Sequence, residues 1–192
     1  MDLILGSQSP RRKEILSFFN LPFGVVSSSF DEDSVPFEGD PVAYVSRLSK
    51  EKAAALSPRF PKSIILTADT TVYGNGKIYN KPMSKDEGFQ SLTELVGKWH
   101  TVYTGITVRR GEEEYTDVEE TKVLLHALTG EQIHFYQHQL HCEDKAGGYA
   151  IQRSGSVIVN RIDGCYYNVM GLPVNALRKL FSKVGIDLWK SL

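Results

Sequence analysis

The sequence of 192 residues predicts an α/β fold in which helices flank a mixed β-sheet. Two observations lead to this prediction. Expected helices and strands alternate along most of the chain, which is typical of α/β proteins. Several expected strands nevertheless follow one another directly, and such strands usually pair antiparallel, so a purely parallel sheet is not expected. With 41% hydrophobic and 23% charged residues, a chain of this length can bury a core without disulfides.

The first third of the chain predicts a strand, a helix, a second strand and a long helix. Residues 3–5 are an apolar run, and Ser9 is a good N-cap before Pro10, so a helix should cover about 10–19. A short strand should cover 23–27, followed by a polar loop over 28–39. Asp40 and Pro41 then begin a helix that should end near Leu56, because apolar residues recur there at helical spacing.

The rest of the chain predicts paired strands separated by helices. An apolar strand at 63–67 runs into Ala68-Asp69-Thr70-Thr71, and the sequence Gly74-Asn75-Gly76 predicts a hairpin between 72–73 and 77–79. Capping boxes at Ser84 and Thr129 begin two further helices, which should end near Gly97 and His138. The remaining expected elements are strands over 99–109 and 114–126, a Gly-rich loop over 143–152, strands over 156–162 and 165–169, and a helix over 173–184.

Charge and composition exclude several classes of function. The formal net charge of −1 leaves no large basic surface, so we expect no nucleic-acid partner. No stretch approaches the ~20 apolar residues that span a bilayer, so we expect no membrane contact. Cys142 and Cys165 form no C-x-x-C pair, and no charged N-terminal segment precedes a long apolar run. We therefore expect a reduced, cytoplasmic protein.

The turn into the first helix is a candidate anion site. Gly6, Ser7 and Ser9 precede a helix start, where backbone N–H groups are free to bind an anion. Arg11 and Arg12 add donors that suit phosphate oxygens. The spacing is not that of a P-loop. The alternative is that Ser9 caps the helix and both arginines are solvated.

Asp69 is a candidate for catalysis or metal binding, because it ends a buried strand. It could accept a proton from water or, with Glu32 from the acidic loop, hold a divalent metal. Lys81 follows a hairpin that folds back and could return near Asp69. The alternatives are a turn-forming aspartate and, for Glu32 and Lys52, solvated surface charges.

The Gly-rich stretch DKAGGYAIQ, residues 144–152, is a candidate ligand loop. Its glycines allow the backbone to approach a ligand closely, and the amide of Gln152 could recognise the edge of a base. The alternative is an ordinary irregular loop. His138, His141 and Cys142 lack the spacing of a zinc site, and no catalytic triad is evident.

Five motifs together resemble the Maf family of nucleotide pyrophosphatases. They are, in order, SQSPRR, ADTTV, NKP, DKAGGYAIQ and NVMGLP, and the resemblance extends over roughly residues 2–180. It implies a single domain over 1–192, of the inosine-triphosphate-pyrophosphatase-like type, with an elongated mixed sheet and two lobes around a cleft. It also implies cleavage of a nucleoside triphosphate to the monophosphate and pyrophosphate, a divalent metal such as Mg²⁺ or Mn²⁺, and a homodimer.

The resemblance further implies a role for nine residues. The catalytic aspartate of the family corresponds to Asp69, which with Glu32 would hold the metal. The positions implied for binding phosphate or supporting the site are Ser9, Arg11, Arg12, Glu32, Lys52 and Lys81. Arg11, Thr70 and Gln152 resemble the branch that acts on dTTP and UTP, and leave open whether the pyrimidine is modified. The alternative is a non-catalytic nucleotide-binding regulator of cell division and septum formation.

Overall fold

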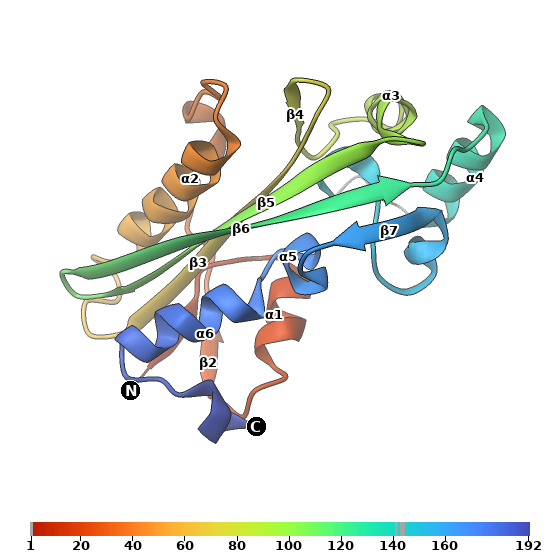
Figure 1. Ribbon diagram of the computed structural model, residues 1–192. Coiled ribbons are helices and arrows are strands. Elements are labelled where there is room, and N and C mark those ends of the chain that lie inside the picture. The colour runs from red at the N-terminus through yellow and green to blue at the C-terminus, as the bar shows by residue number, and fades with distance from the viewer. Residues whose placement is uncertain (1, 141, 143–144) are drawn as a thin grey trace.

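The computed structural model describes residues 2–140, 142 and 145–192, which form one seven-stranded mixed sheet with helices on both faces (Figure 1). The strand order is β2-β1-β3-β5-β6-β7, and the short β4 pairs with β3. β1 is parallel to β2 and β3, whereas the other pairs are antiparallel. The predicted mixed sheet is therefore confirmed. The strands are β1 Leu3–Leu5, β2 Phe23–Val25, β3 Ile64–Gly74, β4 Lys77–Tyr79, β5 Trp99–Arg110, β6 Glu113–Leu125 and β7 Val159–Asp163.

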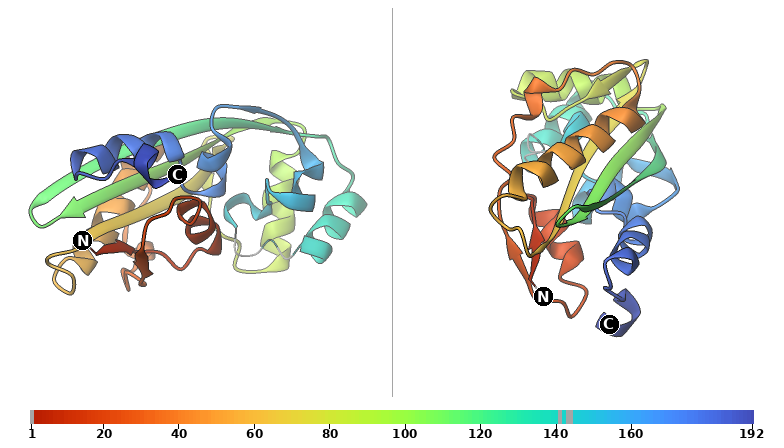
Figure 2. Two further views of the ribbon diagram at one scale, coloured as in Figure 1. Left: turned by 90° about the horizontal axis from the view of Figure 1, so that it is seen from below. Right: turned by 90° about the vertical axis from the view of Figure 1, so that its left-hand side faces the viewer.

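The helices cover the two faces of the sheet unequally (Figures 1 and 2). One long helix, α2, lies across one face of β3 and β5, and the other helices lie over the opposite face or beyond the strand ends. Within the described ranges, every helix is too short or too polar to cross a bilayer. The helices are α1 Pro10–Leu16, α2 Pro41–Leu56, α3 Lys85–Leu95, α4 Gly130–Leu140, α5 Tyr166–Met170 and α6 Val174–Lys183, with 3₁₀ turns η1 Glu32–Ser34, η3 Ala146–Gly148, η4 Arg153–Ile158 and η5 Leu188–Ser191.

The two larger of three hydrophobic clusters among the described residues lie at opposite ends of the long strands. The first joins β1 and the start of β3 to α1, α5 and α6, and includes the fully buried Phe181. The second joins the end of β3 and the start of β5 to α3 and α4. Two cores of this kind can support two lobes, but the division of the domain into lobes stays a prediction.

The strand expected over 165–169 is wrong, because residues 166–170 form α5. The backbone N–H of Gly171 ends this helix by bonding to the carbonyls of Tyr167 and Asn168, and its φ of 104° is a conformation that glycine adopts readily. The strand expected over 156–162 is shorter than expected and begins at Val159, after η4.

Other expectations need smaller corrections. The first helix ends at Leu16, and the second strand ends at Val25. Ser9 occupies the N-cap position of α1, but its side chain makes no capping hydrogen bond with any described residue. His141 and the first two residues of the expected loop, at 143 and 144, lie outside the described residues.

The sheet has an opening along one edge of β3. β1 pairs with this edge only at Ile64–Leu66, and β4 pairs with it only at Val72–Gly74. Between these contacts, residues 67–71 have no strand partner on that side in the part of the chain that the structure describes. The predicted catalytic Asp69 lies in this gap.

Candidate active site

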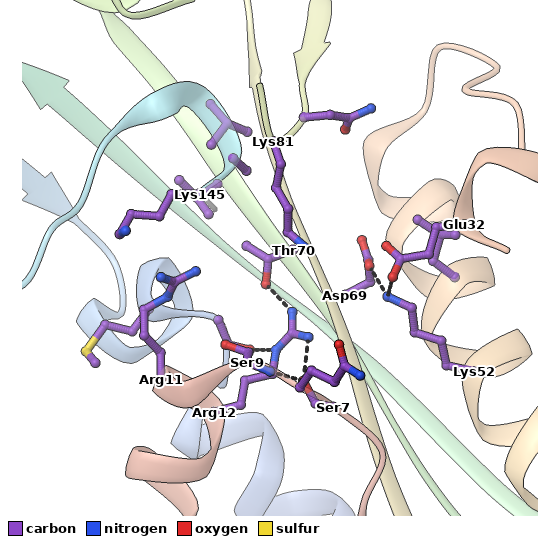
Figure 3. Close-up of a pocket in the computed structure, with 18 of the residues that line it drawn as sticks. Ser7, Ser9, Arg11, Arg12, Glu32, Lys52, Asp69, Thr70, Lys81 and Lys145 are labelled. Atoms are coloured by element: carbon purple, nitrogen blue, oxygen red, sulfur yellow. Dashed lines mark hydrogen bonds and ion pairs between the residues drawn. The ribbon is translucent and has the colours of Figure 1, made fainter. Parts of the chain in front are cut away.

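A cavity of about 590 Å³ lies at the open edge of β3, between the start of α1, one face of α2 and the turn η3 (Figure 3). Its volume is in the range of small-molecule sites. All the residues that the sequence singled out line it: Ser9, Arg11, Arg12, Glu32, Lys52, Asp69, Thr70, Lys81 and Gln152. Residues separated by as many as 143 positions in the chain therefore meet at one cavity.

Asp69 and Thr70 contribute different chemistry to this cavity. Neighbouring residues of a strand point to opposite faces of a sheet. Asp69 points towards α2, and Thr70 points towards α1, yet both line the cavity because the edge between them is open. The cavity therefore has an acidic side and a side formed by Arg12 and Thr70.

On the acidic side, the ammonium group of Lys52 bridges two carboxylates. Lys52 Nζ lies 2.6 Å from Asp69 Oδ1 and 2.9 Å from Glu32 Oε1. Lys52 and Asp69 are 5% and 6% exposed, whereas the side chain of Glu32 on η1 is 47% exposed. The bridge fixes the orientation of Asp69 and keeps two buried charges paired.

On the other side, Arg12 is held by hydrogen bonds from three of its five N–H groups. Its Nε donates to the carbonyl of Gly171 at 2.8 Å, and its Nη1 donates to Ser7 Oγ at 3.3 Å. Its Nη2 donates to Thr70 Oγ1 at 3.0 Å. Two N–H groups remain for a ligand. The guanidinium is therefore oriented before a ligand enters.

The hydroxyl of Thr70 is oriented by a second threonine. Thr104 donates its single proton to the carbonyl of Asn168 at 3.0 Å, so it can only accept from Thr70 across their 2.9 Å contact. Thr70 thus donates to Thr104 and accepts from Arg12. This chain of hydrogen bonds connects the centre of the sheet to the guanidinium.

Burial and opposite charges shift the pKa values of two charged groups in the cavity. Burial lowers the pKa of Arg12, and Asp69 and Glu32 partly oppose this shift. Burial by itself would raise the pKa of Glu32, but Lys52, assisted by Lys81 and Arg12, gives a net lowering. Glu32 is therefore held as a carboxylate, which suits it to bind cations.

The two carboxylates fit a divalent cation that shares its ligands with a substrate. Mg²⁺ in enzymes is commonly held by one or two carboxylates together with phosphate oxygens and water. Glu32 and Asp69 supply two such groups to one cavity. Over the described ranges, no three or more His, Cys, Asp or Glu side chains are grouped so that they could hold a metal ion by themselves. The remaining ligands would therefore have to come from substrate and solvent.

The structure adds cavity residues that the sequence reasoning missed. Tyr44 and Leu48 line the cavity beside Lys52, and their spacing of four residues places all three on one face of α2. That spacing could have identified them. Lys145 also lines the cavity, from the Gly-rich segment before η3 (Figure 3).

The chain is similar in sequence to proteins of one family. Residues 2–184 match the family described as Maf-like protein. A protein of Chlamydia felis named dTTP/UTP pyrophosphatase is 43% identical over 188 residues, covering 97% of this chain and 96% of that protein. A protein of the same name from Clostridium perfringens strain SM101 is 44% identical over 191 residues, covering 98% and 100%. A solved nucleoside-triphosphatase / dITP/XTP pyrophosphatase from Mycobacterium abscessus has a TM-score of 0.43 and 13% identity over 65% of this chain and 74% of that chain, a likeness too distant to bear on function.

Proposed function

Because the chain belongs to the Maf family, we propose that it is a nucleoside triphosphate pyrophosphatase that converts dTTP and UTP to the monophosphate and pyrophosphate. Relatives at 43% and 44% identity that are named dTTP/UTP pyrophosphatases support this substrate class. The proposal rests on one structural observation. Arg12 and Asp69, 57 residues apart in the chain, line a single cavity.

The charges around the cavity suit a triphosphate. Arg11, Arg12, Lys81 and Lys145 all line it, from three separate segments of the chain. The start of α1 adds backbone N–H groups. Cations grouped in this way offset the negative charge of the phosphate groups and favour their binding without any need for a large basic surface.

In the proposed reaction, Asp69 orients a water molecule and accepts its proton as the water oxygen bonds to the α-phosphorus. The bond from that phosphorus to the α–β bridging oxygen breaks, and pyrophosphate leaves with the electron pair. Arg12, Lys52 and Lys81 stabilise its charge. Phosphoryl transfer depends mainly on positioning and charge stabilisation, so no nucleophilic side chain is required.

Glu32 and Asp69 would hold the divalent metal, Mg²⁺ or Mn²⁺. When bound, such an ion neutralises phosphate charge and polarises the phosphorus under attack. The sequence prediction of this cofactor rests on the family resemblance, and the donor chemistry of the two carboxylates supports it.

Recognition of the pyrimidine is assigned to Arg11, Thr70 and Gln152. Gln152 Oε1 is buried and receives no hydrogen bond from any residue that the structure describes. An amide with an unused acceptor suits the N–H and carbonyl groups at the edge of uracil or thymine. The homodimer and the cytoplasmic location stay predictions.

Pyrophosphate release from a panel of nucleoside triphosphates, normal and modified, with Mg²⁺ or Mn²⁺, tests the proposal. We expect dTTP and UTP to be preferred. Asp69→Asn should lower the rate by about two orders of magnitude or more, because it removes the base. Asp117→Asn is the matched control, since Asp117 lies outside the cavity and pairs with Lys179.

Two outcomes would contradict the proposal. Near wild-type turnover by Asp69→Asn would reject Asp69 as the base. Nucleotide binding without pyrophosphate release from any member of the panel would favour the regulator instead.

A further inference from the structure

Lys52 occupies the space between the two carboxylates that would hold a metal ion. Its Nζ contacts one oxygen of Asp69 and one of Glu32, at 2.6 Å and 2.9 Å, so these oxygens lie within about 5.5 Å of each other (Figure 3). A divalent ion that bound both oxygens, at ~2.0–2.1 Å for Mg²⁺, would have to lie between them, as Nζ does. The ammonium group and the metal therefore compete for one position.

The local charge also disfavours a metal ion that arrives alone. Two carboxylates and one ammonium group leave a net charge of −1 on this trio, where the carboxylates by themselves would have −2. Arg12 adds positive charge close to Asp69 and Glu32, and Lys81 adds it close to Glu32. A bare divalent cation is thus attracted less strongly than it would be by Glu32 and Asp69 without Lys52.

A bound nucleoside triphosphate would make the site more attractive to a divalent cation. Its phosphate groups bring negative charge that Lys52, Lys81 and Arg12 can pair with, and they bring oxygens that can complete the coordination of a metal. Among the described residues, no group of three or more His, Cys, Asp or Glu side chains is placed to hold a metal ion, so those extra oxygens are needed in any case.

We propose that Lys52 acts as a resident cation that keeps divalent metal off Glu32 and Asp69 until a nucleoside triphosphate binds. Metal and nucleotide consequently bind with positive cooperativity, each raising the affinity for the other. The inference rests on the proposed function for the identity of the nucleotide. It adds to that function a reason why a lysine is buried between two acids.

The test measures Mn²⁺ binding to the nucleotide-free full chain, with the electron paramagnetic resonance signal of free Mn²⁺ as the readout. The wild-type protein should bind Mn²⁺ weakly. Lys52→Gln should bind Mn²⁺ at least about tenfold more tightly, because a unit positive charge within 3 Å of both carboxylates is gone. Lys52→Arg, which keeps the charge, should resemble wild type. In the double variant Lys52→Gln/Glu32→Gln the gain should disappear.

Lys77→Gln is the matched control for the loss of one positive charge. Lys77 is an exposed lysine that pairs with Glu94 at 2.9 Å and lies outside the cavity. It should leave Mn²⁺ binding unchanged. Equal Mn²⁺ affinity in wild type and Lys52→Gln would overturn the proposal, and so would a gain of the same size in Lys77→Gln.

Wild type alone provides a second measurement in case Lys52→Gln fails to fold. Adding a non-hydrolysable α,β-imido analogue of dUTP should raise the Mn²⁺ affinity of the protein at least about tenfold, after correction for Mn²⁺ bound by free analogue. An unchanged affinity would overturn cooperativity. Pyrophosphate release by wild type is measured separately, so failure of the proposed activity is distinguished from failure of the role of Lys52.

Discussion

Gly105 provides the sharpest test of how the fold positions the proposed catalytic residues. It lies on β5 directly opposite Asp69 of β3, and the backbone of α2 passes over it. A Cβ at residue 105 would lie 2.4 Å from the carbonyl oxygen of Val45, 2.6 Å from its carbon and 3.0 Å from the nitrogen of Ser46. These are helix backbone atoms, which cannot rotate away.

Gly105→Ala therefore forces α2 to move. An ordinary contact requires about 3.4 Å, so the helix must retreat by roughly 1 Å near Val45. Lys52 lies on the same helix, about 10 Å further along its axis. A shift of roughly 1 Å would lengthen its 2.6 Å contact with Asp69 beyond hydrogen-bonding distance. We expect a stability loss of about 1–3 kcal/mol, typical of overpacking, and a rate loss approaching ~100-fold from the misplaced pair.

Urea unfolding and pyrophosphate release from dTTP measure the two effects of Gly105→Ala. Gly24→Ala in β2 is the control, because its Cβ would contact only the flexible end of Ile4, at 3.2 Å. That substitution should leave turnover unchanged. If Gly105→Ala unfolds at the wild-type urea concentration and turns over at the wild-type rate, α2 does not position Lys52 in the way the structure indicates.

Three further predictions concern base choice, the threonine chain and pH. Gln152→Glu should change the preference for dTTP and UTP over other triphosphates more than it changes stability, and an identical preference would count against a role in base recognition. Thr104→Val should raise KM severalfold with less effect on kcat, because Thr70 and then Arg12 lose their orientation. Thr104→Ser keeps the hydroxyl and should restore the wild-type KM. Thr107→Val is the control, since Thr107 is buried on the other face of β5. Burial lowers the pKa of His100 from 6.5 to about 4. Between these pH values the unfolded state therefore binds a proton that the folded state excludes. The free energy of unfolding should consequently fall by up to about 3 kcal/mol as pH drops from 6.5 to 4. In His100→Gln this part of the acid sensitivity should be absent from urea unfolding curves; an unchanged pH dependence would refute it.

Much of the fold could be predicted from the sequence, because its start and stop signals are local. Asp40 caps α2 by accepting from the N–H groups of Val42 and Ala43, and Ser84 caps α3 in the same way. The mixed character of the sheet also followed from the order of the elements. The resemblance to the Maf family, inferred from five motifs, is confirmed.

The error at α5 has a physical cause that no local pattern contains. Its five residues, YYNVM, include aromatic and β-branched side chains, which favour strands. Asn168 instead places its amide inside the protein, where Nδ2 donates to the carbonyl of Val102 and to Thr121 Oγ1. These partners lie 66 and 47 residues away, so tertiary contacts outweigh the local preference.

In the candidate site, too, local patterns predicted the residue types, whereas tertiary contacts decide how their side chains are oriented. Residue types at the motifs pointed to Asp69, Arg12 and the other lining residues, and the structure places them at one cavity. The bridge made by Lys52 could not be predicted, since it depends on how α2 lies across β5. Nor could the orientation of Thr70, which depends on the register that places Thr104 opposite it.

The open edge of β3 explains how two consecutive residues, Asp69 and Thr70, can line two sides of one cavity. The edge is open because its two neighbours leave it early. β1 ends at Leu5, and the chain turns away at Gly6, where a Cβ would lie 2.5 Å from Leu56 Cδ1. β4 begins opposite Gly74 and already ends at Tyr79, opposite Val72. A strand that filled the gap would separate the face of Asp69 from the face of Thr70, as a continuous sheet does. The short β1 and β4 therefore allow the acid and the hydroxyl that binds Arg12 to act on the same ligand.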